Sequence, residues 1–281
     1  MTIVRKVFIM GVLVLLVVSL GCVSQEEVPT KEGILNAIDQ IDAYTYEMTE
    51  VQELVSGDGS KRTYTLYTLG GIDRKNKVFF SFGEFNASHD SSHEGTRSWG
   101  YFDGARFYLK IEKNDGGVVL TNTLSYTLDE LYEETGKYLG TNLTKEEYLE
   151  MALEIHDILG NKLKAIISNS TVTSVERDGK LYVLTIEGHI EYDESPKVPQ
   201  QAMEDYEKSL KRGVSSNVTG RIWVDDKMRP VKAEFKKKVR TTFESSGEGY
   251  EKVSTSTIVF NYEFALPSWV EELKSEAAEE G

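Results

Sequence analysis

Residues 231–264, VKAEFKKKVRTTFESSGEGYEKVSTSTIVFNYEF, alternate between apolar and polar side chains with a period of two. Ala233 and Phe235 share one face of this pattern, and Lys236 and Lys238 share the other. Such alternation is typical of strands that are buried on one face and hydrated on the other. The glycines in ESSGEGY indicate a turn, so the stretch predicts two long antiparallel strands.

The same period of two recurs on both sides of the middle of the chain. It predicts further strands at 44–56, 62–69, 78–82, 99–102, 106–112, 172–177, 181–190 and 218–224. Residues 70–77, which begin with two glycines, are expected to form a turn, and residues 83–98 a polar loop.

Apolar residues at helical spacing indicate which segments cover this sheet. They predict helices at 30–42, 128–139, 144–168 and about 200–211, and a short acidic helix after Pro267. A sheet with one apolar face needs such a cover to exclude water. We therefore predict an α+β fold, in which a strongly curved antiparallel sheet forms an unclosed half-barrel and the helices pack on its concave face.

The N-terminus carries the pattern of an export signal. Arg5 and Lys6 precede an apolar run at 7–20, and Cys22 follows Gly21 directly. Cys22 is the only cysteine of the chain and lies where a lipoprotein signal places its lipid-bearing residue. We expect lipidation of Cys22, with an uncleaved N-terminal anchor helix as the alternative. Either way the body is expected to lie outside the cytoplasm, anchored to the cell membrane.

These boundaries divide the chain into four parts. We expect a signal peptide with its lipobox at 1–21, a polar tether at 22–29, a single domain at 30–265 and an acidic helical tail at 266–281. The domain is expected to be single because strands lie on both sides of the central helices. Neither half has enough strands to close a sheet by itself.

Composition excludes several classes of function. The chain has 281 residues, a formal net charge of −14, one Cys and four His. A single cysteine rules out a disulfide framework or a multi-cysteine metal site, and the acidic balance argues against nucleic-acid binding. The chain also lacks the sequence motifs of nucleotide-binding loops and of hydrolase nucleophiles. We therefore expect no enzymatic activity, no cofactor and no metal.

Two further features concern the surface. Four asparagines lie in N-x-Ser/Thr sequons and are possible glycosylation sites: Asn86, Asn142, Asn169 and Asn217. The lysines and Arg240 on the polar face at 232–240 form a cationic strip. This strip could meet an anionic surface or an acidic protein partner, or it could be an ordinary solvated strand face.

The order of elements resembles that of the lipoprotein-carrier-like superfamily, which includes LolA-like and LppX-like proteins of prokaryotes, some of them archaeal. The resemblance rests on the segments YTYE at 44–47, GIDRKNK at 71–77, YFDGARFY at 101–108 and IWVDDKMRPV at 222–231, together with the lipobox. It implies an unclosed β-barrel that holds helices, and in some members a hydrophobic cavity that binds acyl chains or lipids.

Two functions from different classes follow. The first is a membrane-tethered lipoprotein that binds a lipid or another hydrophobic ligand between sheet and helices. The second is a structural or sensory surface module that binds a protein partner and has a packed interior. For the first, alternation and helical spacing nominate these residues as the cavity lining: Phe80, Phe82, Phe107, Leu109, Tyr148, Met151, Ile155, Leu159, Phe235 and Phe260.

Overall fold

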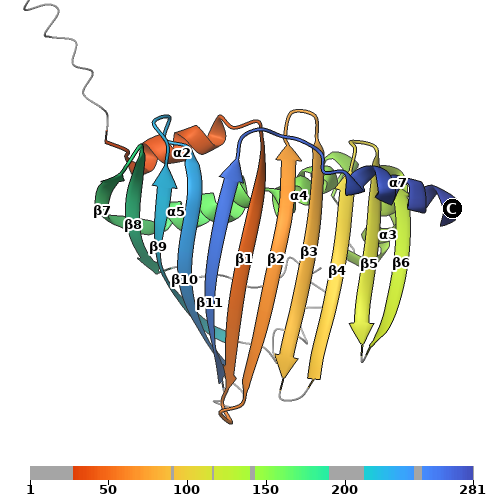
Figure 1. Cartoon of the computed structure of the whole chain (residues 1–281), viewed down its shortest axis with the longest axis horizontal. Coiled ribbons are helices and arrows are strands. Elements are labelled where there is room, and N and C mark those ends of the chain that lie inside the picture. The colour runs from red at the N-terminus through yellow and green to blue at the C-terminus, as the bar shows by residue number, and fades with distance from the viewer. Residues whose placement is uncertain are drawn as a thin grey trace, which may run out of the picture.

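Eleven strands form one antiparallel sheet, which does not close on itself, in the order β6-β5-β4-β3-β2-β1-β11-β10-β9-β8-β7 (Figure 1). This computed structural model describes residues 28–89, 92–115, 117–139, 143–189, 212–243 and 249–280. The strands are β1 Ala43–Ser56, β2 Lys61–Asp73, β3 Val78–His89, β4 Ser92–Phe102, β5 Arg106–Asp115, β6 Val118–Thr127, β7 Ser170–Asp178, β8 Leu181–His189, β9 Arg212–Val224, β10 Pro230–Phe243 and β11 Gly249–Asn261. The predicted α+β class and the unclosed antiparallel sheet are confirmed.

Helices fill the connection between the two edge strands. After β6 the chain forms α3 Leu128–Leu139, α4 Lys145–His156, the π-helix η1 Ile158–Leu163 and α5 Lys164–Ser168, and β7 then begins. This run crosses one face of the sheet, which we call the inner face (Figure 1). The N-terminal helix α2, Lys31–Asp39, packs against η1 and α5. Its N-cap is Thr30, whose side chain accepts a hydrogen bond from Gly33.

The main hydrophobic core lies between the inner face and these helices. Tyr44, Ile72 and Phe79 enter it from the strands, and Ile38 and Leu159 from the helices. Ile38, Tyr44, Ile72 and Leu159 are 0% exposed, and Phe79 is 3% exposed. Burial of this kind stabilises the fold by about 1.5–3 kcal/mol per large apolar side chain. Under the helices, the inner face is therefore filled by packed side chains.

A smaller core lies on the opposite, outer face. Helix α7, Trp269–Glu280, buries Val270 and Leu273 against Phe80 and Tyr101 of β3 and β4. The acidic C-terminal helix expected from the sequence is therefore present, and the side that carries Val270 and Leu273 packs on the sheet. Its glutamates at 271 and 272 remain exposed.

The turn between β2 and β3 differs from the expectation. Gly70 and Gly71, predicted to open a turn, continue β2. A Cβ on Gly70 would lie 2.5 Å from the ring of Tyr46, and one on Gly71 would lie 2.5 Å from the ring of Phe80. Each glycine thus makes room for an aromatic ring on its own face of the sheet. Within this hairpin the pair is needed for packing, and the turn comes later, at 74–77.

Three other segments also differ. Much of the expected polar loop at 83–98 is strand, because β3 and β4 extend into it and form a long hairpin. Residues 118–127, for which nothing was predicted, form β6. The expected helix at 144–168 is interrupted at Asp157, where the backbone leaves helical geometry. The helix expected at about 200–211 lies outside the described residues.

Candidate functional site

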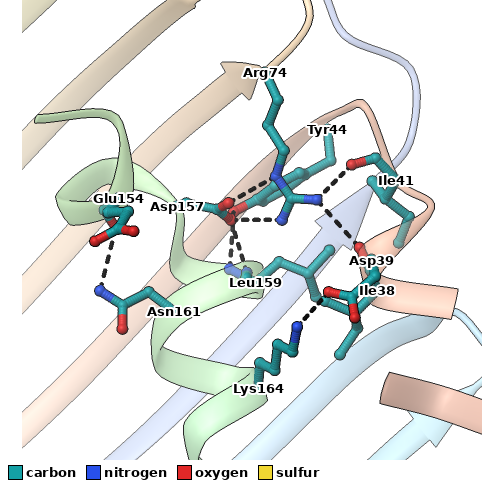
Figure 2. Close-up of polar contacts among 11 residues, drawn as sticks. Ile38, Asp39, Ile41, Tyr44, Arg74, Glu154, Asp157, Leu159, Asn161 and Lys164 are labelled. Carbon is teal, nitrogen blue, oxygen red and sulfur yellow. Dashed lines mark hydrogen bonds and ion pairs between the residues drawn. The ribbon is translucent and has the colours of Figure 1, made fainter. Parts of the chain in front are cut away.

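A polar cluster joins the helices to the sheet (Figure 2). Asp157 accepts hydrogen bonds from Arg74 Nε at 2.7 Å, from Arg74 Nη2 at 2.9 Å and from the Tyr44 hydroxyl at 2.8 Å. Arg74 Nη1 also donates to the carbonyl oxygens of Ile38 at 3.1 Å and Ile41 at 2.6 Å, at the end of α2. One guanidinium therefore connects β2, α2 and the start of the π-helix.

The same cluster begins the π-helix. The backbone N–H of Gly160 donates to Asp157 Oδ1 at 2.7 Å, and that of Leu159 donates to the Tyr44 hydroxyl at 2.8 Å. These bonds satisfy two N–H groups that a helix start leaves without partners. A Cβ on Gly160 would lie 2.5 Å from both Arg74 Nη2 and Asp157 Oδ2, so glycine is required for the close approach.

Electrostatics keep this cluster in one protonation state. Burial and the charge of Asp157 raise the pKa of the Tyr44 hydroxyl far above its ordinary value. Burial disfavours the charged form of Arg74, but its hydrogen bonds to Asp157 and the attraction of that carboxylate raise its pKa overall. Over the physiological pH range the phenol therefore stays neutral and the guanidinium stays charged. The cluster acts as a structural connection between layers.

The π-helix in turn positions a lysine over β1. Lys162 Nζ lies 3.2 Å from Glu50 Oε2, and Gln52 Nε2 donates to Glu50 Oε1 at 2.8 Å. Glu50 is only 8% exposed. Burial opposes its charge, but Lys162, Gln52 and Lys252 together hold the pKa of its carboxyl below the ordinary value. Glu50 is therefore ionised at neutral pH.

A cavity of about 310 Å³ lies beside this ion pair, on the inner face next to η1 and α5. Its lining combines four apolar side chains with charged and polar groups. The lining residues are Glu50, Gln52, Lys162, Ile166, Val218, Phe235, Lys237, Val239, Tyr250, Lys252, Ser254 and Ser256. The three lysines outnumber the one carboxylate, so the lining favours a ligand that has a negatively charged end and an apolar part.

The residues nominated from the sequence are distributed over several places. Phe235 lines the cavity. Leu159 and Phe260 belong to the core under the helices, and Phe107 packs against it. Leu109 shares the inner face with Phe107 by strand alternation.

The remaining nominated residues lie on helix α4 or on the other side of the sheet. Tyr148 is buried and Met151 is partly buried, whereas Ile155 is 65% exposed. Phe80 and Phe82 are on the outer face, with ring centroids 6.1 Å from Trp269 and 5.2 Å from Trp99. They differ from the prediction because Phe79 is the residue of β3 that faces the helices.

Sequence reasoning missed Glu50, Lys162, Lys237 and Lys252. A signal for Glu50 is present, because it continues the inward series of Tyr44, Tyr46 and Met48 at a spacing of two. Lys237 likewise falls on the apolar side of its strand. A charged residue on a buried face indicates a polar site. The contribution of Lys162 depends on the π-helix, and periodicity does not reveal that element.

The predicted surface sites have the following positions. Asn86, Asn169 and Asn217 are exposed, whereas Asn142 and Cys22 lie outside the described residues. In the cationic strip, Lys232 lies 2.7 Å from Glu234 and Lys238 lies 2.9 Å from Glu251, so these two lysines have acidic neighbours.

Two features are absent from the described part of the chain. Within it, no three His, Cys, Asp or Glu side chains are grouped so that they could hold a metal ion. No helix in those residues combines the length and apolar character that crossing a membrane requires.

Comparisons with known proteins give weak similarities. No family model matches the chain, and no curated protein matches it. Among solved structures, a beta-barrel-like protein of a domain of unknown function from Brucella abortus has 10% identity and a TM-score of 0.28, over 78% of this chain and 98% of that one.

Two more solved structures are less similar. The translocator domain of the autotransporter NalP from Neisseria meningitidis has 8% identity and a TM-score of 0.21, over 81% of this chain and 92% of that one. MucB in complex with MucA(peri) has 9% identity and a TM-score of 0.13, over 84% of this chain and 100% of that one.

Proposed function

We propose that this protein is a non-catalytic lipoprotein that binds an amphipathic, anionic lipid on the inner face of its sheet. The observation that carries this proposal is the cavity beside η1 and α5. Phe235, Val239 and Ile166 supply an apolar wall, and Lys237 and Lys252 supply positive charge in the same lining. An acyl chain with a carboxylate or phosphate headgroup matches both halves of that lining.

The packed core limits where the ligand can bind. Packed side chains occupy the space directly beneath α2, η1 and α5. The ligand therefore binds at the margin of the helical layer, where Lys162 of the π-helix lines the cavity. Only part of an extended chain fits in about 310 Å³, so its remainder follows the open inner face of the sheet.

Attachment to a membrane completes the proposal. A lipid on Cys22 would hold the domain outside the cytoplasm, close to a source of amphipathic ligands. Mass spectrometry of the protein from its own membrane should find a lipidated Cys22 at the mature N-terminus. Full retention in the membrane by Cys22→Ala, with unchanged mass, would instead support an uncleaved anchor helix.

Palmitate binding to the full chain tests the ligand site. Palmitate should raise the melting temperature. At a hundredfold excess over its dissociation constant, it should add about 2.7 kcal/mol to the free energy of unfolding. Hexadecanol, which has the same chain length without the charge, should raise it less. Lys252→Met should weaken the palmitate effect, and Val239→Trp should abolish it by filling the cavity.

Lys236→Met is the matched control. Lys236 is next to Lys237 in β10 but is exposed on the outer face. Its replacement removes the same charge from the chain without changing the lining of the cavity. If palmitate does not raise the melting temperature, or if Lys236→Met weakens the effect as much as Lys252→Met, the proposal is wrong. A surface module that binds a protein partner then becomes the better account.

A further inference from the structure

The two edges of the unclosed sheet are protected very differently. Strand β6 is at one edge and β7 at the other, so each has only one neighbouring strand. A strand with one neighbour directs half of its backbone N–H and C=O groups away from the sheet. Proteins usually protect such an edge with charges, irregular geometry or a covering element.

Edge strand β7 has all three kinds of protection. Its sequence STVTSVERD ends in Glu176, Arg177 and Asp178. Its pairing with β8 is irregular between Val172 and Ser174. Helix α5 packs against it as well. These features discourage another strand from pairing with this edge.

Edge strand β6 has neither charge nor irregularity. Its sequence VVLTNTLSYT contains no Asp, Glu, Lys, Arg or Pro. Its register with β5 is regular over the whole strand. At its start, Val118 is 61% exposed, Val119 59% and Leu120 62%. Three consecutive large apolar side chains are thus exposed at the start of an edge strand that has neither charge nor irregularity, a pattern that indicates a partner strand.

Only the first half of β6 is accessible to a partner. Residues 118–122 are all exposed, whereas Thr123 is 5% exposed. The helix α7 crosses the far end of β6 on the outer face and continues past it (Figure 1). A partner strand beside residues 123–127 would therefore meet α7. We call residues 118–122 the edge segment.

We propose that the edge segment pairs, antiparallel, with the same segment of a second copy of this chain. A two-fold axis through Leu120 would place Val118 opposite Asn122 and Val119 opposite Thr121 of the copy. The two sheets then continue across the axis as one sheet. In this register α7 of each copy lies beyond the end of the other copy's strand, so the two helices do not collide.

The absence of charge on the edge segment makes a second copy an admissible partner although the chain is acidic. The whole chain has a formal net charge of −14, so most of its surface repels a second copy. The edge segment is uncharged and places neutral residues opposite neutral residues at the axis. Self-pairing therefore brings no like charges together at the axis, and the segment offers no opposite charge to the side chains of a charged peptide. Val119 and Leu120 point to opposite faces, so pairing covers apolar surface on both sides of the joined sheet.

Disulfide trapping in the full chain tests the pairing directly. Directly opposed residues of an antiparallel pair have Cα atoms about 4.5–5.5 Å apart, which suits a disulfide. Under mild oxidation in its own membrane, Leu120→Cys should give a covalent dimer. Thr171→Cys, at an exposed position of the protected edge β7, is the matched control and should remain monomeric.

Mass in detergent solution provides the second measurement. The unmodified chain should sediment as a dimer, and Leu120→Lys should be a monomer because two ammonium groups would meet at the axis. Thr171→Lys should remain a dimer. Because Leu120 is exposed, its replacement should leave the fold of the single chain intact. A monomeric unmodified chain, a dimeric Leu120→Lys variant, or a disulfide to a protein of another mass would overturn the proposal.

Discussion

The polar cluster around Asp157 predicts a large loss of stability when that one carboxylate is removed. Asp157→Ala removes two hydrogen bonds from Arg74, one from the Tyr44 hydroxyl and one from the N–H of Gly160. The Arg74 side chain, which is 26% exposed, then has no carboxylate beside its guanidinium. The start of the π-helix also loses its cap.

The size of the effect follows from these exposures. Breaking a buried ion pair from one side costs about 3–5 kcal/mol, and loss of an N-cap costs about 1 kcal/mol. Water reaches part of the Arg74 side chain and weakens the pair, so we expect less than the sum of the two costs, about 3 kcal/mol in total. For a chain of this length, that corresponds to a fall in melting temperature of roughly 6–12 °C.

Urea and thermal denaturation measure this prediction, with Asp39→Ala as the control. Asp39 pairs with Lys164 on the same side of the molecule, but its side chain is 56% exposed (Figure 2). Its removal should cost less than about 1 kcal/mol. If Asp157→Ala destabilises the protein no more than Asp39→Ala, the cluster does not connect the layers in the way described.

Three further changes test other parts of the structure. Burial lowers the pKa of His156 to about 4, so the unfolded chain binds the proton more strongly. Stability should fall by about 2 kcal/mol between pH 7 and pH 5 from this group alone, and urea midpoints should show a weaker fall in His156→Phe. Gly220→Ala would place a Cβ 2.4 Å from a phenylalanine ring and 2.5 Å from a backbone oxygen, so urea denaturation should show a free energy of unfolding lower by about 1–3 kcal/mol. Gly83→Ala, whose Cβ meets only a serine hydroxyl at 3.1 Å, should show no such loss. Leu273→Ala, on the buried side of α7, should lower the free energy of unfolding by about 2–4 kcal/mol in thermal denaturation. If the loss is as small as that of Leu266→Ala, whose side chain is 43% exposed, α7 does not pack on the sheet.

Much of the sheet could be predicted because strand alternation is a local signal. The split of β10 into Ala233 and Phe235 on one face and Lys236 and Lys238 on the other is found in the structure. The sequence of β6 does not indicate a strand, since apolar and threonine side chains follow one another there without a clear contrast between faces. Its strand character comes from pairing with β5, which is a tertiary contact.

The candidate site was harder to predict because its parts come from distant segments. Phe235 was identified from alternation and does line the cavity. Phe80 was assigned to the wrong face, since neighbouring aromatic residues on β3 leave the inward direction undetermined without the sheet's register. The ion pair of Glu50 with Lys162 joins residues 112 positions apart, through a π-helix that depends on the Arg74 cluster. Periodicity contains no information on such contacts.

The pairing of β1 with β11 has a consequence for the order of assembly. Strands β1 to β6 follow one another in both sequence and space, and so do β7 to β11, so each group is a meander built from local contacts. The two meanders meet in the sheet only at the seam between Ala43–Ser56 and Gly249–Asn261. Long-range pairing of this kind forms slowly. During synthesis, the edge of β1 therefore stays open until β11, near the C-terminus, has been made. In a chain that stops before β11, no strand pairing joins the two half-sheets.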